Sequence, residues 1–176
     1  MLNEKLGIDE RDQKIITLLE EDPNISQSEI ASRIKLSQPS VGMRIHKLRQ
    51  KGILSRMVGM NFKKVGLFLA KVDVATTDTE KVIKSFDQCP FFLNGLIVTG
   101  TDNLCLFLMS PDMKVLEGII NHHLRAHPNV KNVKMDIVIS PVKDLVFPVS
   151  LSATDPKKKE FIEKCRVCPY RKKVFS

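Results

Sequence analysis

The apolar positions near the start of the chain recur at helical spacing. Ile15, Leu18 and Leu19 form one apolar stripe, which predicts a helix from Glu10 to about Glu21. Asp9 stands where its side chain can cap the first turn, and acidic residues crowd that turn, as the helix dipole favours. The sequence therefore opens on an amphipathic helix with one buried face.

Two further helices are indicated directly afterwards. Ser26, with Glu29 three positions later, reads as a capping box that opens a helix over residues 27–34. Ser37 can cap a third helix that runs to about Lys51, with a proline tolerated in its first turn. Three short helices with a tight turn between the last two are typical of a helix-turn-helix. Residues 53–58 then read as a short strand, either a wing or the connection leaving the domain.

The third helix has two distinct faces. Val41, Ile45 and Leu48 fall at i, i+4 and i+7 and are expected to pack on the first two helices. The opposite arc is largely polar, and it is the face of such a helix that enters the major groove of DNA.

The middle of the chain alternates between strand and helix patterns. Residues 67–74 alternate with a period of two, so that Lys71 and Asp73 face away from the buried side. The predicted order is strand, helix, strand, strand, helix, strand, over residues 67–74, 79–88, 91–99, 104–109, 113–126 and 133–139. This order is that of a ferredoxin-like α+β sandwich. The outer face of the sheet is also apolar at Leu67 and Leu69, which suggests that a second copy covers it.

Charge changes the picture for the helix-turn-helix. From Arg33 to Arg56 there are seven basic residues and no acidic one, whereas the 32 residues before carry three basic and eight acidic ones. A cationic stretch on a helix-turn-helix pattern indicates phosphate binding and therefore DNA. The expected DNA-binding residues are Gln38, Pro39, Ser40, Met43, Arg44, Lys47, Arg49 and Arg56.

Within that set the expected roles differ. Gln38, Ser40, Met43 and Arg44 stand near the N-terminal half of the helix and are assigned to base edges, with Gln38 suited to adenine and Arg44 to guanine. For Arg44, a phosphate clamp or a salt bridge within the domain is equally open. The remaining cations are assigned to phosphates.

Composition divides the 176 residues into three segments. Residues 1–62 form the expected winged helix-turn-helix, residues 63–150 the ferredoxin-like domain, and residues 151–176 a basic tail. No apolar run approaches the roughly 20 residues of a membrane-spanning helix, and the start does not read as a signal peptide. We therefore expect a cytoplasmic protein.

The tail carries a C-x-x-C pair, Cys165 and Cys168, among lysines and arginines. Such a pair is half of a zinc site, because tetrahedral zinc takes four ligands. A metal site shared between subunits, a redox pair and no specific chemistry all stay open.

The sequence resembles the Lrp/AsnC family of transcription regulators from about Ile8 to Ser140. The resemblance is carried by residues 9–16, 25–31, 36–48 and 51–54, by the turn Val98-Thr99-Gly100-Thr101-Asp102, and by the turn at residues 127–130. It implies a winged helix-turn-helix joined to a sensing domain of the RAM or ACT type. It also implies homodimers that assemble into tetramers or octamers on double-stranded DNA, and regulation by a small molecule such as an amino acid.

In this family the effector binds near the glycine-and-aspartate turn, which implies Thr99, Gly100, Thr101 and Asp102 here. The alternative is that Gly100 and Asp102 only shape a β-hairpin, as such pairs usually do. Polar Thr101 and Asn103 stand where bulkier residues are common in the family. The alternatives are a metal- or thiol-responsive regulator that senses through the tail cysteines, and a DNA-wrapping architectural protein. Siroheme decarboxylases resemble the family in fold, but the middle domain lacks a clustered acid, base and nucleophile, so no enzyme activity is expected.

Overall fold

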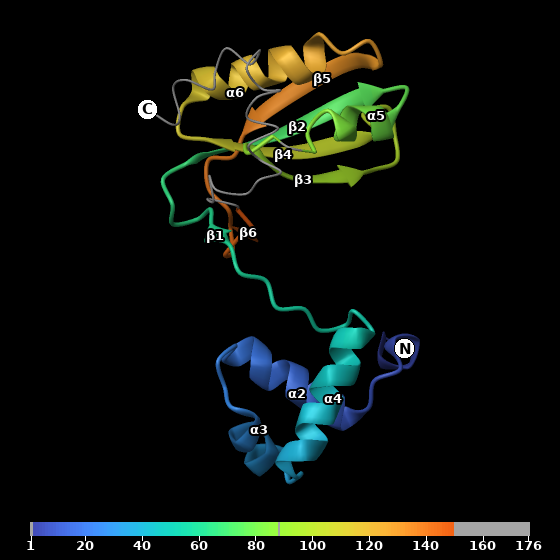
Figure 1. Cartoon of the computed structure of the whole chain (residues 1–176), viewed down its shortest axis with the longest axis vertical. Coiled ribbons are helices and arrows are strands. Elements are labelled where there is room, and N and C mark those ends of the chain that lie inside the picture. The colour runs from blue at the N-terminus through green and yellow to red at the C-terminus, as the bar shows by residue number, and fades with distance from the viewer. Residues whose placement is uncertain (1, 88, 150–176) are drawn as a thin grey trace, which may run out of the picture. The chain divides into compact units, whose positions relative to one another are not determined.

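A computed structural model describes residues 2–87 and 89–149. The chain divides into two compact units, with the boundary between Arg56 and Met57. Figure 1 shows the N-terminal unit built of helices and the C-terminal unit built around a sheet. Among the described residues no helix is both long enough and apolar enough to cross a membrane.

The N-terminal unit contains the three predicted helices, α2 (Glu10–Glu21), α3 (Gln27–Ile34) and α4 (Gln38–Gln50). They are preceded by the short helix α1 (Leu2–Leu6), which the sequence pattern did not predict. Three begin at the predicted caps: the side chain of Asp9 accepts from the N–H of Asp12, that of Ser26 from Glu29, and that of Ser37 from Ser40. Each cap satisfies a backbone N–H that has no partner within its helix, which is why the starts were readable from sequence.

The core of this unit comes from the predicted stripes. Ile15, Ile30 and Val41, one from each of α2, α3 and α4, are fully buried. Where α4 faces α3, Gly42 lies beside the flexible side chain of Gln27, whose oxygen would be 2.9 Å from a Cβ at that position. The helix pair is therefore packed as a helix-turn-helix requires.

Of the two alternatives for residues 53–58, the structure matches the connection leaving the domain and not a wing. Within residues 2–56 the structure has no strand, and residues 53–59 are also without one. The short strand β1 (Met60–Asn61) pairs antiparallel with β6 (Val146–Phe147), which belongs to the C-terminal unit. The adjoining Phe62 is buried against Phe147, with ring centroids 5.8 Å apart. Apolar burial thus draws this segment into the second unit, and the boundary falls six residues before the expected one after residue 62.

The C-terminal unit has the predicted strand-helix-strand-strand-helix-strand order. Its elements are β2 (Phe68–Thr76), α5 (Thr79–Lys84), β3 (Phe92–Ile97), β4 (Leu104–Ser110), α6 (Met113–Ile120), the π-helix η1 (Asn121–Arg125) and β5 (Val130–Ile137). The four-stranded sheet has the order β3-β4-β2-β5 and every neighbouring pair is antiparallel. This is the ferredoxin-like topology that the pattern predicts.

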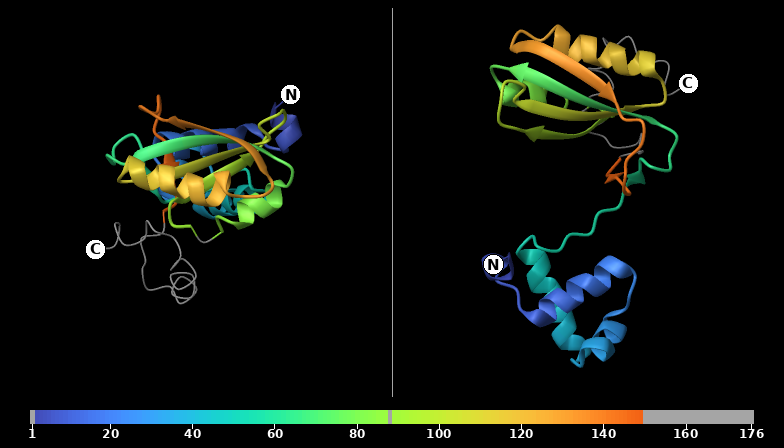
Figure 2. Two further views of the ribbon diagram at one scale, coloured as in Figure 1. Left: turned by 90° about the horizontal axis from the view of Figure 1, so that it is seen from above. Right: turned by 180° about the vertical axis from the view of Figure 1, so that it is seen from behind.

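The main core lies between the sheet and its helices. Val72 and Leu106 of the sheet pack with Val82 of α5 and with Leu116 and Ile119 of α6, all almost completely buried. Figures 1 and 2 show both helices on one side of the sheet. The sheet therefore has a covered helical face and a second, outer face.

Part of the outer face is covered within the chain itself. Leu69 is 3% exposed and packs in one cluster with Phe62 and Phe147. The apolar residue that suggested a second copy at this position is thus buried by the chain's own β1 and β6. The rest of the outer face carries charged residues, among them Lys71 and Asp73 of β2.

Candidate nucleic-acid interface

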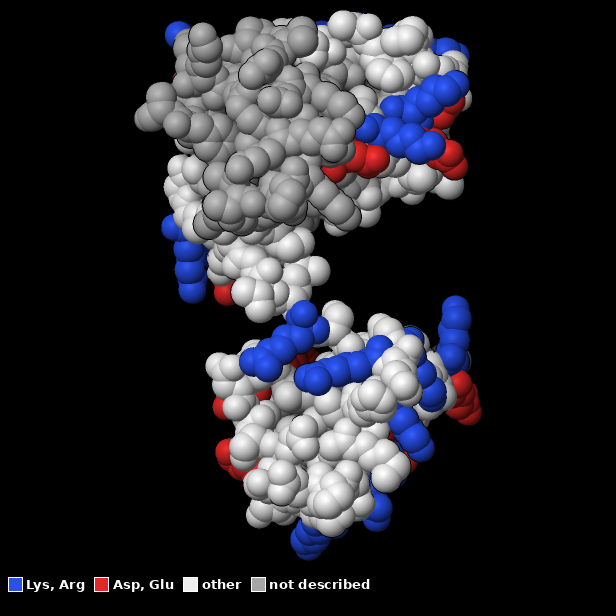
Figure 3. Space-filling view, in the orientation of Figure 1, with Lys and Arg blue, Asp and Glu red and all other residues white. Residues whose placement is uncertain are grey.

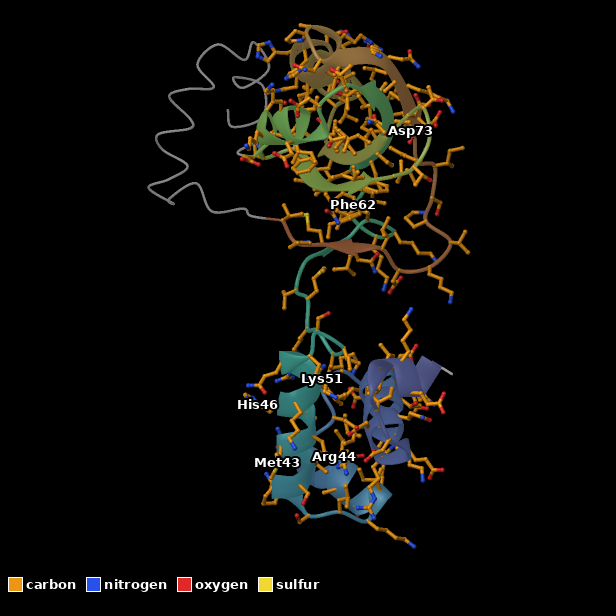
Figure 4. The ribbon with its side chains drawn as sticks, turned by 90° about the vertical axis from the view of Figure 1, so that its right-hand side faces the viewer. Met43, Arg44, His46, Lys51, Phe62 and Asp73 are labelled. Atoms are coloured by element: carbon orange, nitrogen blue, oxygen red, sulfur yellow. The ribbon has the colours of Figure 1, made fainter. Side chains whose placement is uncertain are left out.

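Helix α4 presents an exposed face that contains most of the predicted DNA-binding residues. Gln38, Pro39, Lys47 and Arg49 are exposed, and Met43 retains 58% of its accessible surface. Figure 4 shows Met43 and His46 on the side of α4 that points away from α2. An exposed methionine beside cations, on a helix without an acidic residue, is compatible with insertion into a DNA groove.

The first turn of α4 uses one predicted contact residue for capping. The hydroxyls of Ser37 and Ser40 lie 2.9 Å apart, and the Ser37 side chain also accepts the N–H of Ser40. Ser40 is half-buried as a result. Gln38 and Pro39 precede it and stay exposed at the N-terminal end of the helix.

Arg44 lies on the other side of α4, toward α2 (Figure 4). Its guanidinium donates to Asp12 at 2.7 Å and to Asp9 at 2.8 Å, and its side chain is 28% exposed. The hydrogen bonds to Asp12 and Asp9 raise the pKa of Arg44, and the backbone N–H of Asp12 together with Arg44 lowers the pKa of Asp9. Of the alternatives for Arg44, the geometry matches the salt bridge within the domain, so the side chain does not face the DNA-reading arc.

The other cations divide into paired and solvent-facing groups. Arg33 binds Glu29 at 2.6 Å, and Arg56 donates to the side-chain oxygen of Asn24 at 3.2 Å. Within the described residues, Lys47 and Arg49 have no ion-pair partner. Figure 3 shows lysine and arginine side chains projecting from several sides of this unit, so the cationic segment does not form one dense patch in that view.

Lys51 has a structural contact that the sequence pattern did not indicate. Its ammonium donates to the carbonyl of Gly7 at 3.0 Å and so ties the end of α1 to the end of α4. The two residues lie 44 positions apart, and no local signal marks the pair. Lys51 also sits where a cation suits the C-terminal end of a helix.

In the C-terminal unit, the predicted effector residues form the exposed turn between β3 and β4. Thr99, Gly100 and Thr101 are exposed and Asp102 is half-buried. Gly100 adopts a φ of 115°, a conformation that side-chain-bearing residues rarely take, and the space beside its Cα is open.

The turn is anchored by Asn103, a polar residue at a position where the Lrp/AsnC resemblance leads us to expect a bulkier one. Its side-chain oxygen accepts the N–H of Thr76 and its amide donates to the Thr76 carbonyl, both at 3.0 Å. One side chain thus satisfies both backbone groups of Thr76, at the irregularity between Ala75 and Thr76 in the β2–β5 pairing. The arrangement holds the turn against the end of β2.

The predicted metal residues Cys165 and Cys168 lie outside the described residues. Among the residues that are described, no group of three or more histidine, cysteine, aspartate and glutamate side chains could hold a metal ion. Cys105 is buried in the sheet, where burial and the neighbouring Asp73 raise the pKa of its thiol.

Comparisons with known proteins agree with this architecture. Residues 8–49 match the family model of the AsnC-type helix-turn-helix domain. An uncharacterized HTH-type transcriptional regulator of Pyrococcus horikoshii is 28% identical over 144 residues, which cover 79% of this chain and 90% of the relative. The HTH-type transcriptional regulator LrpA of the same organism is 27% identical over 77% of this chain and 99% of its own length. The regulatory protein AsnC of Haemophilus influenzae is 27% identical over 65% and 79% of the two chains.

Solved structures share the fold along most of the chain. Escherichia coli AsnC superposes with a TM-score of 0.66 at 14% identity, over 79% of this chain and 97% of that one. Bacillus subtilis LrpC superposes with a TM-score of 0.65 at 24% identity, over 77% of this chain and 97% of LrpC. A Neisseria meningitidis transcriptional regulator, solved as a complex with L-Met, superposes with a TM-score of 0.65 at 21% identity, over 82% of this chain and 97% of that regulator. Residues 8–49 thus match an AsnC-type helix-turn-helix, and along most of its length the chain is similar to transcription regulators of the Lrp/AsnC family.

Proposed function

We propose that this regulator recognises a specific duplex DNA sequence with the exposed arc of α4. The observation that carries the proposal is an N-capped helix without acidic residues, held against α2 by Arg44, with Gln38, Met43 and Lys47 directed to solvent. Its capped end has the geometry with which a recognition helix enters the major groove.

The contacts divide by chemistry. Gln38 can pair with an adenine edge, Pro39 and Met43 supply apolar contact with thymine methyls, and Ser40 offers its hydroxyl beside them. Lys47, Arg49 and Arg56 neutralise phosphates, while Arg44 sets the position of the helix and does not read a base.

The test is fluorescence anisotropy of the full chain on DNA from upstream of its own gene and on a scrambled duplex of equal composition. We expect at least about a thousandfold preference for the native duplex, as specific regulators show. Gln38→Ala should reduce that preference, whereas Gln13→Ala on α2 should leave it unchanged. Equal affinity for both duplexes would contradict sequence-specific recognition and would favour an architectural role.

We also propose that Thr99, Gly100, Thr101 and Asp102 bind a small effector such as an amino acid. The exposed turn and the open space beside Gly100 allow close approach to the backbone, and Asp102 could accept an amino group. Support comes from the Neisseria meningitidis regulator of the same fold, which was solved with L-Met.

Calorimetric titration of the twenty amino acids against the full chain tests the effector site. A ligand whose affinity falls tenfold or more in Asp102→Asn, but not in Asp144→Asn, would support it. A ligand that binds both variants and the parent equally would place the effector elsewhere.

The remaining part of the proposal concerns assembly. The chain forms homodimers in the cytoplasm that assemble further into tetramers or octamers, so that two copies of α4 reach half-sites about one helical turn apart. Sedimentation velocity on the full chain measures this, and a monomer at all concentrations would contradict it.

A further inference from the structure

The outer face of the four-stranded sheet carries a regular arrangement of charges. Cross-strand partners place Lys71 of β2 opposite Asp136 of β5, and Asp73 opposite Lys134. Side chains of antiparallel partners point to the same face, and positions two apart on a strand do so as well. These four residues, here termed the charge square, therefore share one face, the one opposite α5 and α6.

Opposite signs alternate along both edges of the square. Lys71 is ion-paired with Asp73 along β2, and Lys134 lies 3.3 Å from Asp136 along β5. The hydrogen bond from Lys71 is the largest cause that lowers the pKa of Asp73, and the charge of Lys134 lowers it further. The four groups are thus close enough to interact, and their net charge is zero.

Apolar side chains continue the same face on the other side of the square. Cys105 is the cross-strand partner of Asp73, and Leu96, which is 48% exposed, is in turn the partner of Cys105. Phe107 is the partner of Lys71 and is half-buried. Figure 4 labels Asp73 in the sheet and Phe62 next to β1. Phe62 belongs to the cluster with Leu69 and Phe147 that covers one end of the outer face within the chain.

This pattern suits one kind of partner. A polyanion such as DNA requires a surplus of positive charge, and an acidic peptide requires the same. A neutral square of alternating signs instead matches an equal square on a second surface, and a two-fold contact brings the same patch of two copies together. Phe107 packs against Phe147 of the same chain, so the apolar area open to such a contact is that of the exposed Leu96.

We propose that the charge square makes this face select a second copy of the chain as its dimer partner, by matching each charge with an opposite one across the contact. The inference rests on the proposed dimer and goes beyond it, because it names the residues that determine which chain is accepted. Charges at an interface contribute chiefly to specificity, because like charges in contact repel and so exclude a wrong partner.

The test converts the square to a single sign in two ways. Lys71→Glu with Lys134→Glu leaves four negative charges, and Asp73→Lys with Asp136→Lys leaves four positive ones. Each double variant should dimerise at least tenfold more weakly than the parent by sedimentation equilibrium, because its squares repel. An equimolar mixture of the two should recover dimers, and native mass spectrometry should show that these are heterodimers.

Lys84→Glu with Lys114→Glu is the matched control for the negative variant, because these exposed lysines lie on α5 and α6 and the change in net charge equals that of Lys71→Glu with Lys134→Glu. This control should dimerise like the parent. If a charge-reversed variant does not fold by circular dichroism, the neutral pairs Lys71→Gln with Lys134→Gln and Asp73→Asn with Asp136→Asn replace it, and a weakened dimer is again expected.

The outcomes separate the two proposals. A parent that is monomeric overturns the dimer and the inference together. A dimeric parent whose two reversed variants associate as tightly as the parent leaves the dimer standing and overturns the inference. Weakened variants that do not recover in the mixture also overturn it, because the charges would then not be matched across the contact.

Discussion

Arg44 of α4 and Asp12 of α2 form an ion pair with a nitrogen-to-oxygen distance of 2.7 Å, although they lie 32 positions apart. Asp12 also belongs to the capping box that begins α2, together with Asp9. The arginine thus connects the middle of α4 to the first turn of α2. A residue of a type suited to guanine recognition instead holds the helix that carries the proposed base-reading residues.

Replacement of Arg44 by alanine should loosen α4 without removing a phosphate contact. We expect the free energy of unfolding of the N-terminal unit to fall by about 1–2 kcal/mol, as for hydrogen bonds to charged groups that are partly exposed. Hydrogen exchange of the α4 amides in the full chain measures this loss of stability. Asp12→Asn should cause a similar loss, and the double variant should lose less than the sum of the two, because both substitutions break the same ion pair. DNA affinity should fall with an unchanged salt slope; a smaller slope with unaltered exchange would identify Arg44 as a phosphate contact instead.

Lys47→Ala should affect DNA binding through electrostatics alone. Its exposed ammonium is expected to neutralise one phosphate, so its removal should lower the slope of log affinity against log salt by about 1, for native and scrambled duplexes alike. Lys14→Ala on α2 is the control, since Lys14 is also exposed but lies on the supporting helix. Equal slopes for Lys47→Ala and the parent would remove Lys47 from the interface.

Phe147→Ala should destabilise the C-terminal unit. Phe147 is 9% exposed and its ring lies 5.8 Å from that of Phe62 and 5.6 Å from that of Phe107. Truncation of a buried phenylalanine costs about 3–5 kcal/mol, so the urea midpoint of sheet unfolding should fall clearly. Val142→Ala, at a side chain that is 94% exposed, should change stability by less than about 0.5 kcal/mol. A small effect of Phe147→Ala would mean that β1 and β6 are not part of the folded unit.

His123 should make stability depend on pH. Its ring packs 4.9 Å from that of Phe86, and burial, with the neighbouring charge of His122, lowers the pKa of His123 from 6.5 to about 4. The unfolded chain therefore binds this proton more readily than the folded one. The stability that depends on neutral His123 is therefore fully present above pH 6.5 and is lost as the pH falls toward about 4.

Thermal unfolding of the parent and of His123→Gln between pH 8 and pH 4 checks this dependence. The parent should lose more stability than the variant across that window, and the difference measured at pH 8 gives the packing cost of the substitution. Parallel curves would show that the proton on His123 is not linked to folding.

The helical part of the fold could be predicted because its signals are local. Asp9, Ser26 and Ser37 cap helices through bonds to residues three positions away, and the stripe of Val41, Ile45 and Leu48 follows from 3.6 residues per turn. The order of elements in the second unit was likewise visible from strand alternation and helical periodicity.

Long-range relationships were not predictable in the same way. The strand expected over residues 53–58 is absent, and Met60–Asn61 finds its partner at Val146–Phe147, far along the chain. A short extended segment carries no local information about its partner, because pairing is decided by which apolar residues it can bury on both sides.

The helix-turn-helix, the order of strands and helices along the chain and the surplus of cations could be read from the sequence, since each depends on neighbours within a few residues. The contacts of Arg44 with Asp12 and of Asn103 with Thr76 became visible only in the folded chain, as did the charge square of Lys71, Asp73, Lys134 and Asp136. The physical reason is that the direction of a side chain follows from its own backbone, whereas its partner depends on how distant segments pack.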